Sequence, residues 1–341
     1  LNTTPESYEL HQAFAQMVEA GCEYAVMEVS SQGIKMHRTD GLYFNYAIFT
    51  NISPDHIGPG EHADFEEYLY YKTRLLNMCG IGLVNKDDKH APQIIKAANC
   101  ELCTYSEESK EADFVASDIR YVSQPDFVGT EFHISGKYDM EVRLGIPGLF
   151  NVVNALAAVS VCSFLGLDQA RISHALENIR VNGRMEIVYT SERCTVLVDY
   201  AHNAVSMESL LSTLRDYKPK RLVCVFGCGG NRSKDRRYSM GEIGGKMADL
   251  SIITADNSRY EKVEDIIADI RGSIEKTGGK FIEIPDRREA IRYSILHAQP
   301  GDMVAVIGKG HEDYQEINGV RHHFLDREVI EETVKELGEK A

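Results

Sequence analysis

The stretch RLVCVFGCGGNRSKDRRYSMGEIGGKMADLSIITADN, residues 221–257, decides the fold class of this 341-residue chain. It begins with an apolar run that ends in glycines at 221–230 and closes with a second apolar run at 251–257. Between them, the spacing of apolar residues at 242–250 predicts a helix. Two apolar runs joined by a helix are typical of parallel strands with a crossover connection. The stretch therefore predicts an α/β fold.

The same alternation continues on both sides of this stretch. The further elements expected are strands at 194–202, 280–286 and 302–310 and helices at 206–217, 263–276 and 288–298. Strict alternation of strand and helix predicts a Rossmann-like, doubly wound parallel sheet. In such a sheet, ligands bind at the carboxyl ends of the strands.

The first half of the chain predicts a second α/β domain, because 341 residues exceed one ordinary core. Its expected elements are helices at 6–20, 63–79 and 151–166, strands at 24–30 and 46–52, a strand and turn at 80–88, and a small antiparallel sheet of hairpins at 112–145. The domain therefore combines a mostly parallel sheet with a small antiparallel one. We place the boundary near Arg184–Val188, which gives domains 1–185 and 186–341.

The composition is that of a soluble globular protein, with 43% hydrophobic and 26% charged residues. A formal net charge of -15 argues against nonspecific attraction to nucleic acid or anionic lipid. No apolar run approaches the length of a membrane span, so a cytoplasmic location is expected. The eight cysteines lack the paired spacing of a structural zinc site, and we expect reduced thiols.

Polar clusters follow four of the predicted strands. They read DYAH at 199–202, GCGGNR at 227–232, TADNSR at 254–259 and GKGHED at 308–313. Carboxylates in them (Asp256, Glu312) suit an ammonium, and the guanidinium groups of Arg232 and Arg259 suit carboxylates. The set would fit a zwitterionic amino acid with an additional carboxylate. A surface ion-pair network is the alternative. The glycines do not form a dinucleotide fingerprint, and no phosphate loop is present in these residues.

A second group of candidate residues lies in the first half of the chain. Glu28 ends a predicted strand, and Asp55, His56, Glu61 and His62 lie in the loop after the next strand. Carboxylate and imidazole groups from adjacent strand ends suit a divalent ion that works with phosphates. The alternative is a helix cap and a solvated loop. Taken alone, Lys72 is expected to be a solvated residue on a helix surface.

Ten motifs, in order along the chain, resemble those of the Mur ligase family. They are NTTPES, MEVSSQG, TNISPDH, YYKTRLL, GLFNVVNALAA, NGRMEIV, VDYAHNAVSMESLL, FGCGGNRSKDRR, TADNSR and GKGHEDYQ. The resemblance implies an ATP-dependent, three-domain acid–amino acid ligase, with a central ATP- and metal-binding domain at 1–185 and a C-terminal amino-acid-binding domain at 186–341. The family's uridine-binding domain and phosphate loop would lie upstream of Leu1. We therefore expect these residues alone to be inactive.

The resemblance also implies a two-step reaction that uses ATP and Mg²⁺ in peptidoglycan precursor synthesis. The γ-phosphate of ATP moves to the D-Glu γ-carboxylate of UDP-N-acetylmuramoyl-L-Ala-D-Glu, and an incoming amine attacks the acyl phosphate to form an amide. The implied metal ligands are Glu28, His56 and carbamylated Lys72, and the implied catalytic residues are Lys72 and His202. The implied binding residues are Asn154, Arg184 and Asp199 for ATP, Thr3, Thr4, Ser30 and Arg38 for the acceptor, and Arg232, Asp256, Asn257, Arg259, Gly308 and Glu312 for the amino acid.

The motif at 256–259 bears on which amino acid is added. Family members that use meso-diaminopimelate commonly carry DNPR, whereas lysine-using members tend to lack the arginine. Here Ser258 replaces proline and Arg259 remains. Proline mainly stiffens a turn, whereas arginine supplies a charge for the distal carboxylate of diaminopimelate. We therefore expect meso-diaminopimelate, with L-lysine as the alternative. Gln32 and Met36 depart from the family pattern, and the longer loop leaves His62 unassigned.

Three other functions remain as alternatives. A sibling ligase such as folylpolyglutamate or cyanophycin synthetase is disfavoured by TADNSR and GKGHEDYQ. A nicotinamide-dependent oxidoreductase is disfavoured by the glycine spacing. A non-catalytic Mur-ligase-like protein without its phosphate loop stays open. The expected partners are the muramoyl dipeptide and the amino acid, with no nucleic acid or membrane, and the protein is expected to be a monomer.

Overall fold

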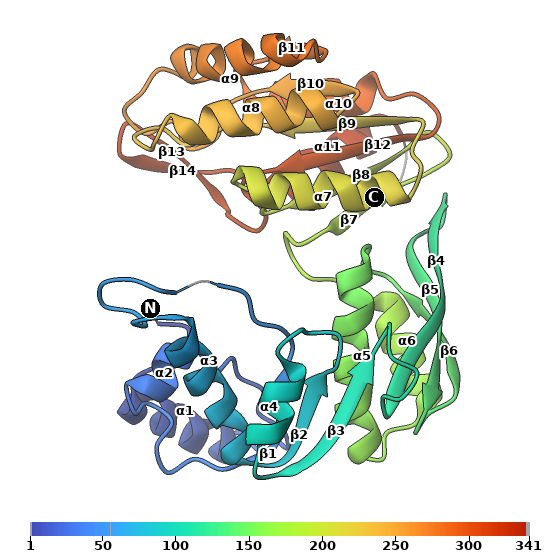
Figure 1. Cartoon of the computed structure of the whole chain (residues 1–341). Helices are drawn as coiled ribbons and strands as arrows, with labels where there is room; N and C mark the ends of the chain where they lie inside the picture. Colours follow the sequence, from blue (N-terminus) through green and yellow to red (C-terminus); the bar gives the residue numbers. More distant parts are fainter. Residues whose placement is uncertain (1, 55, 339–341) are drawn as a thin grey trace. The chain divides into compact units, whose positions relative to one another are not determined.

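The computed structural model describes residues 2–54 and 56–338, which form two compact units (Figure 1). The first unit comprises 1–117, 133–140 and 152–172, and the second comprises 118–132, 141–151 and 173–341. Each unit has its own hydrophobic core. The units interleave in sequence along the β4–β5 hairpin, and the domain ranges 1–185 and 186–341 stay a prediction.

The first sheet has six strands in the order β1-β2-β3-β4-β5-β6. The strands are β1 (Phe44–Phe49), β2 (Cys79–Asn85), β3 (Glu101–Ser106), β4 (Phe114–Gln124), β5 (Phe127–Gly136) and β6 (Met140–Leu144). β1 to β4 pair in parallel. Only two residues join β4 to β5, a length that permits an antiparallel hairpin but no crossover. The predicted combination of parallel and hairpin strands is confirmed.

Helices connect and cover these strands. They are α1 (Ser7–Glu19), α2 (Ser31–Lys35), α3 (Phe65–Arg74), the 3-10 turn η1 (Leu75–Asn77), α4 (Ala91–Ala97), α5 (Leu149–Phe164) and α6 (Gln169–Asn178). Asp64 begins α3, because its side chain accepts a hydrogen bond from the Glu67 amide. Leu69 of α3 and Ile94 of α4 pack with Val84 of β2 in the core of the first unit.

The strand predicted at 24–30 is not formed. The segment is extended, but a strand requires a hydrogen-bonded neighbour, and within residues 2–54 and 56–338 this segment belongs to no sheet. Its apolar side chains are not buried, since Tyr24 is 61% and Val26 98% exposed. The apolar pattern at 24–30 was therefore a wrong indication of a strand in this structure.

The second sheet confirms the predicted doubly wound topology. Its order is β11-β10-β9-β12-β8-β7. The strands are β7 (Glu186–Thr190), β8 (Cys194–Asp199), β9 (Arg221–Phe226), β10 (Leu250–Ile253), β11 (Phe281–Glu283) and β12 (Asp302–Ile307). The five strands from β11 to β8 pair in parallel, and β7 adds an antiparallel edge.

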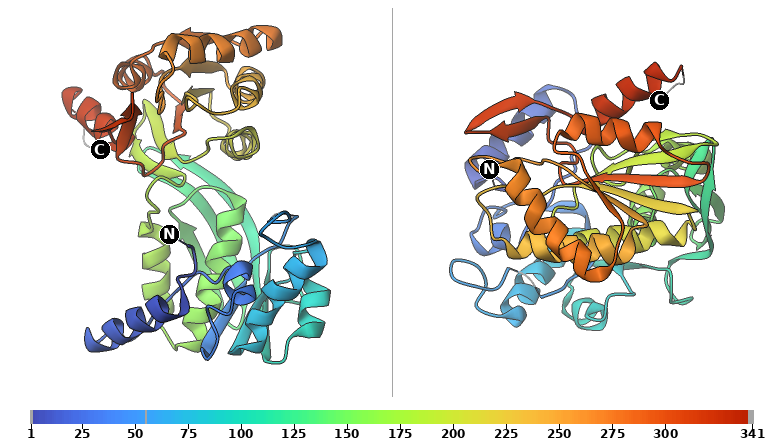
Figure 2. Two further views of the ribbon diagram at one scale, coloured as in Figure 1. Left: turned by 90° about the vertical axis from the view of Figure 1, so that its left-hand side faces the viewer. Right: turned by 90° about the horizontal axis from the view of Figure 1, so that it is seen from above.

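Helices cover both faces of this sheet (Figure 2). They are α7 (Ala204–Asp216), α8 (Asp235–Met247), α9 (Val263–Thr277), α10 (Arg287–Leu296) and α11 (Asp326–Glu336). Successive strand residues point to opposite faces, so Leu197 packs in the core with α7, α8 and α9, whereas its neighbour Val198 packs with α10 and α11. Because both faces are covered, the strands are apolar throughout, as the sequence predicts.

A two-stranded antiparallel hairpin of β13 (Tyr314–Ile317) and β14 (Val320–His323) follows β12. Residue Arg259, after β10, pairs with Ile317 of this hairpin in an isolated parallel bridge. The hairpin therefore lies over the segment that carries the TADNSR motif. No helix in the described part of the chain combines the length and apolarity needed to cross a membrane.

Candidate active site

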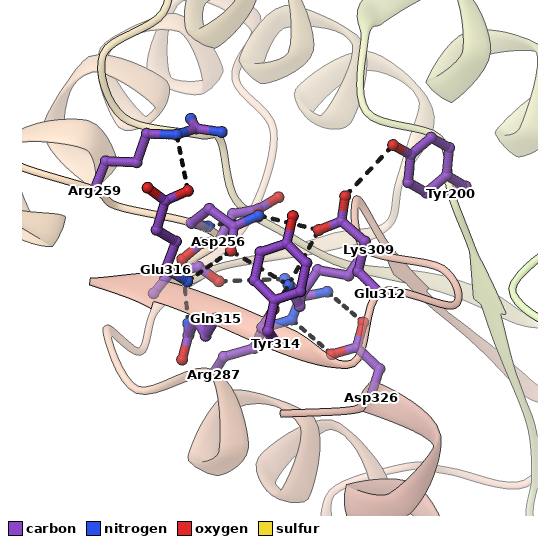
Figure 3. Close-up of polar contacts among 12 residues, drawn as sticks. Tyr200, Asp256, Arg259, Arg287, Lys309, Glu312, Tyr314, Gln315, Glu316 and Asp326 are labelled. Carbon is purple, nitrogen blue, oxygen red and sulfur yellow. Dashed lines mark hydrogen bonds and ion pairs between the residues drawn. The ribbon is translucent and has the colours of Figure 1, made fainter. Parts of the chain in front are cut away.

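The segments after β10 and β12 bring together five of the six residues predicted to bind the amino acid. Asp256 and Asn257 are 8% and 7% exposed, and Nδ2 of Asn257 donates to Oε2 of Glu312 over 3.1 Å. Oε1 of Glu312 accepts from the Tyr200 hydroxyl at 3.4 Å. Figure 3 shows Asp256, Glu312 and their neighbours around one cluster of polar groups. The predicted convergence on the carboxyl ends of the strands is therefore observed.

Gly308 fits closely against this cluster. Its φ of 112° lies in the region that favours glycine. Its amide donates to the backbone oxygen of Asp199 at 3.1 Å, which ties the ends of β12 and β8 together. A Cβ atom at Gly308 would come within 2.9 Å of Oδ2 of Asp256. A side chain at this position would therefore occupy the space in front of that carboxylate.

Arg259 lies at the edge of the cluster with a positive φ of 51°. Its Nη1 donates to the backbone oxygen of Gly230 at 2.7 Å, and its Nε lies 3.4 Å from Oε2 of Glu316 (Figure 3). Its amide also donates to the backbone oxygen of Glu316 at 2.9 Å. These contacts fix the guanidinium while its second terminal nitrogen keeps donor capacity for a carboxylate.

Arg232 is the sixth residue of the predicted amino acid group. It follows the glycines after β9 and is exposed. Arg232 and Arg259 both lie close to Gly229. A Cβ atom built at Gly229 would be 3.9 Å from Cγ of Arg232 and 2.9 Å from Nη1 of Arg259. The structure therefore places Arg232 on a neighbouring segment, outside the buried polar network of Asn257 and Glu312.

Two buried basic residues support the cluster, and neither was singled out from the sequence. Lys309 is fully buried, and its ammonium lies 3.4 Å from Oε2 of Glu312. Arg287 forms a fully buried bidentate pair with Asp326 at 2.7 and 2.6 Å. Lys309 follows a buried apolar run between two glycines, which is a usable signal. Arg287 follows a turn and reads as an exposed helix start.

Arg287 also holds the ends of two strands. Its Nη1 donates to the backbone oxygen of Ala255 at 3.2 Å, and its Nη2 donates to that of Ile307 at 3.0 Å. These residues immediately precede Asp256 and Gly308. The guanidinium thus fixes the two backbone segments from which the polar cluster is built.

Asp199 and Arg184, predicted to meet ATP, lie in the second unit near His202. Burial raises the pKa of Asp199, although the amides of Met185 and Ala201 donate to its two oxygens. The guanidinium of Arg184 and the ring of His202 both contact Tyr200, at 4.9 and 4.8 Å from its ring centroid. These three predicted residues are thus grouped around the end of β8.

Asn154, the remaining residue of the predicted ATP group, is exposed on α5. It belongs to the first unit, whereas Arg184 and Asp199 belong to the second. The predicted ATP group is therefore not brought together within one unit.

The predicted acceptor group forms a network in the first unit. The hydroxyl of Thr4 is fully buried, accepts from the Ser30 amide at 2.9 Å and donates to the backbone oxygen of Glu28 at 3.1 Å. Nη1 of Arg38 donates to the backbone oxygen of Thr4 at 3.3 Å. Thr3, the residue before Thr4, is exposed. The side chains of Thr4 and Ser30 thus hold the loop before α2.

Two of the three predicted metal ligands contact the same aromatic ring. The ring of His56 lies 5.8 Å from that of Tyr68, and the ammonium of Lys72 lies 5.4 Å from the same ring and 3.4 Å from the backbone oxygen of Asn51. Glu28 is exposed on the extended segment 24–30. Asp55, named with His56 from the sequence, lies outside the described residues.

Whether the side chains near Lys72 can bind a metal ion depends on the donor atoms that they offer. Within residues 2–54 and 56–338, no group of three His, Cys, Asp or Glu side chains could hold a metal ion. An ammonium at Lys72 cannot be a ligand, because it has no acceptor. A carbamate there would add two oxygens that share one negative charge, and His56 contacts the same Tyr68 ring. The donors fit Mg²⁺ only in that form, since this ion prefers oxygen ligands.

His62, unassigned from the sequence, is fully buried and lies 2.9 Å from the Ser31 hydroxyl through its Nε2. Burial, followed by the charge of Lys35, lowers its pKa. A neutral imidazole therefore connects the loop before α3 to the start of α2. In the sequence, His62 lies in a polar loop, so neither its burial nor its contact with Ser31 could be predicted.

Two family models together match most of the chain. The Mur ligase middle domain matches residues 1–162, and the Mur ligase, glutamate ligase domain matches residues 183–310. The chain belongs to the Mur ligase family. The residues that the motifs single out therefore lie in a Mur ligase middle domain and in a Mur ligase, glutamate ligase domain.

Curated Mur ligases resemble the chain over almost its full length. A UDP-N-acetylmuramoyl-L-alanyl-D-glutamate--2,6-diaminopimelate ligase of Caldanaerobacter subterraneus subsp. tengcongensis is 39% identical over 341 residues, covering 98% of this chain and 68% of that protein. The enzyme of the same name from Trichormus variabilis is 41% identical, covering 96% of this chain and 66% of the relative. The chain thus spans about two thirds of these relatives.

Solved structures of Mur ligases share the fold. A structure of a UDP-N-acetylmuramoyl-L-alanyl-D-glutamate--2,6-diaminopimelate ligase matches with a TM-score of 0.77 at 33% identity, covering 99% of this chain and 70% of that one. A UDP-N-acetylmuramate-alanine ligase from Thermotoga maritima matches with a TM-score of 0.59 at 19% identity, covering 86% and 60%. At that identity, the second match shows the fold alone.

Proposed function

We propose that this chain carries the central and C-terminal parts of an ATP-dependent ligase that adds meso-diaminopimelate to UDP-N-acetylmuramoyl-L-Ala-D-Glu. The amide forms at the D-Glu γ-carboxylate, in peptidoglycan precursor synthesis. The observation that carries the proposal is the cluster of Asp256, Asn257, Glu312 and Arg259 after the ends of β10 and β12. The proposal is supported by the relatives, which are named 2,6-diaminopimelate ligases.

The cluster offers acceptors for the ammonium group of an amino acid and a donor for its carboxylate group. The carboxylates of Asp256 and Glu312 would accept from an ammonium, and Arg259 would donate to a carboxylate. Diaminopimelate carries an ammonium and a carboxylate at each end. We assign the distal pair to these residues and the carboxylate nearer the reacting amine to Arg232. The absence of a side chain at Gly308 leaves room in front of Asp256.

The remaining predicted residues are assigned to the first step. Asn154, Arg184 and Asp199 would bind ATP, with His202 beside them as a catalytic residue, and Thr3, Thr4, Ser30 and Arg38 would bind the acceptor. Glu28, His56 and carbamylated Lys72 would hold Mg²⁺. The ion would offset the charge that moves between phosphate oxygens, where such catalysis gains most. The acyl phosphate then reacts with the incoming amine, and phosphate leaves.

One observation favours L-lysine as a second candidate. Arg259 already has an anionic partner, because its Nε lies 3.4 Å from Glu316. A lysine substrate lacks a distal carboxylate, but Glu316 would still supply a counter-charge for the Arg259 guanidinium. Against it, lysine would leave the remaining donors of Arg259 without the acceptor that diaminopimelate supplies. A non-catalytic role would need the loss of ATP turnover in the complete protein.

A competition experiment tests this assignment. The protein expressed from its complete gene receives ATP, Mg²⁺, the muramoyl dipeptide and equal concentrations of meso-diaminopimelate and L-lysine. Mass spectrometry of the products should show the diaminopimelate adduct in large excess. A predominant lysine adduct would keep the ligase and overturn the amino acid, and no adduct would leave the non-catalytic alternative. Size-exclusion chromatography tests the proposed monomer.

A further inference from the structure

Lys309 is the fully buried lysine in the middle of the polar cluster (Figure 3). It follows β12 and lies between Gly308 and Gly310, which both have positive φ angles, 112° and 54°. Burying an unpaired ammonium is costly, so its partners determine whether it is tolerated. Those partners come from two segments that meet at this point, one after β10 and one from β12 into β13.

The ammonium has three acceptors. It donates to the backbone oxygen of Tyr314 in β13, and it lies 3.4 Å from Oε2 of Glu312 and 3.5 Å from Oδ1 of Asn257. A lysine ammonium has three N–H donors and no acceptor. Its donors are therefore used within the protein. Lys309 is suited to hold other groups in place, and it is not positioned to accept a proton from a substrate.

These contacts fix the orientation of the Asn257 amide. Its Oδ1 receives Lys309 at 3.5 Å and the Glu316 amide at 2.9 Å, so this side of the group must be the acceptor. Its Nδ2 is then left to donate to Oε2 of Glu312. The reversed amide would place an N–H group against an ammonium. Lys309 and the Glu316 amide thus together determine that Asn257 turns its N–H side toward Glu312.

The same contacts fix Glu312 and its charge. Its Oε2 receives both Asn257 and Lys309, whereas among residues 2–54 and 56–338 the one donor to Oε1 is the Tyr200 hydroxyl, at 3.4 Å. Oε1 is thus the oxygen with capacity for a ligand. Lys309 also offsets one of the two carboxylates, Asp256 and Glu312. The pair then presents a single net negative charge, which matches one ammonium group.

We propose that Lys309 is a positioning residue for the incoming amino acid, acting through Asn257 and Glu312. It orients both side chains and sets the charge of the ammonium subsite to minus one. The inference rests on the proposed function, because it assigns this subsite to the amino acid. It adds a residue that touches neither substrate but determines how tightly the ammonium is held.

The test measures three Michaelis constants of the complete protein carrying Lys309→Met. The KM for diaminopimelate should rise roughly 30-fold or more, which is the low end of the loss when one partner of a buried, hydrogen-bonded charge pair is removed. The KM values for ATP and the muramoyl dipeptide should stay within about twofold. Lys246→Met is the matched control, since that lysine is exposed and pairs with Glu242 on its own helix. It should change none of the three constants.

A second variant and a cycle separate positioning from folding. Lys309→Gln keeps two N–H donors without the charge, so the KM for diaminopimelate should rise in this variant too. It replaces Lys309→Met if the methionine variant does not fold. In the double variant that combines the Lys309 change with Glu312→Gln, the rise in the KM for diaminopimelate should be smaller than the product of the two single effects. The reason is that both changes break the same interaction, between Lys309 and Glu312. Equal rises in all three KM values, or effects that multiply, would overturn the inference.

The wild-type protein distinguishes the two levels of the proposal. Absence of phosphate release that depends on the amino acid would overturn the proposed function and this inference together. Normal wild-type activity with an unchanged diaminopimelate KM in a folded Lys309 variant would overturn the role of Lys309 alone. Urea unfolding of each variant shows whether it is folded at the assay temperature.

Discussion

Asn257 and Glu312 are joined by a 3.1 Å hydrogen bond, although 55 residues separate them. They follow β10 and β12, and β9 lies between these two strands in the sheet. The contact must therefore pass over the end of β9. Three of the four residues after β9 are glycines, and a Cβ at Gly230 would overlap the backbone oxygen of Ser258. Small residues at this point allow the two outer segments to meet.

Gly230→Ala should disrupt this arrangement. The added Cβ would meet backbone, which cannot move aside like a flexible side chain, and we expect a loss of about 2 kcal/mol or more in unfolding free energy. Gly272→Ala is the matched control, because nothing lies within 4 Å of its Cβ position in α9. It should be stabilising by about 0.5–1 kcal/mol. Urea denaturation measures both, and equal effects would refute the close approach.

Arg259→Lys should reduce the preference for diaminopimelate over lysine. A lysine keeps the charge but carries its donors on a single nitrogen, whereas the planar guanidinium can reach Gly230, Glu316 and a substrate carboxylate through separate nitrogens. We expect the ratio of kcat/KM values for the two amino acids to fall by about 10- to 100-fold. Arg271→Lys, on the exposed face of α9, should leave the ratio unchanged. An undiminished ratio in Arg259→Lys would argue against the proposed contact.

Asp326→Asn should destabilise the second unit strongly. The variant leaves the fully buried guanidinium of Arg287 without its carboxylate, and breaking a buried pair in this way costs about 3–5 kcal/mol. Glu332→Gln removes the partner of Arg288, which is an exposed pair, and should cost less than about 1 kcal/mol. Denaturant unfolding of the two variants gives the comparison. Similar losses would show that burial of the Arg287 pair is unimportant.

Glu107 should make stability depend on pH. Burial, followed by the charges of Asp87 and Glu108, raises the pKa of Glu107 from 4.5 to about 7. The unfolded chain loses this proton first, so the unfolding free energy should fall as the pH rises from 4.5 to 7. After allowance for partial solvent exposure, the fall is about 2 kcal/mol. Glu107→Gln should flatten the profile there, and an unaltered profile would contradict the assignment.

The sheet of the second unit was predictable because its strands are buried on both faces and appear as uninterrupted apolar runs. Four polar clusters at the ends of these runs then located Asp256 and Glu312. The segment 24–30 shows the limit of this reasoning. Its apolar pattern is that of a strand, but a strand also needs a neighbour, which the pattern does not report.

Other parts of the site could not be inferred from residue type. Lys309 and Arg287 are basic residues, which are mostly exposed, and only their partners make burial possible. Those partners lie on different segments, such as Asp326 at the start of α11. Glu316 belongs to a four-residue strand, which is too short to produce a clear alternation. Spacing in the sequence does not indicate such contacts.

Phosphate release by the complete protein tests the central proposal most directly. The assay contains ATP, Mg²⁺ and the muramoyl dipeptide, with meso-diaminopimelate, with L-lysine, or with no amino acid. We expect sustained release with diaminopimelate and only background release in the other two arms. Release that is equal with lysine would contradict the assignment of Arg259, and no release above background in any arm would contradict the ligase itself.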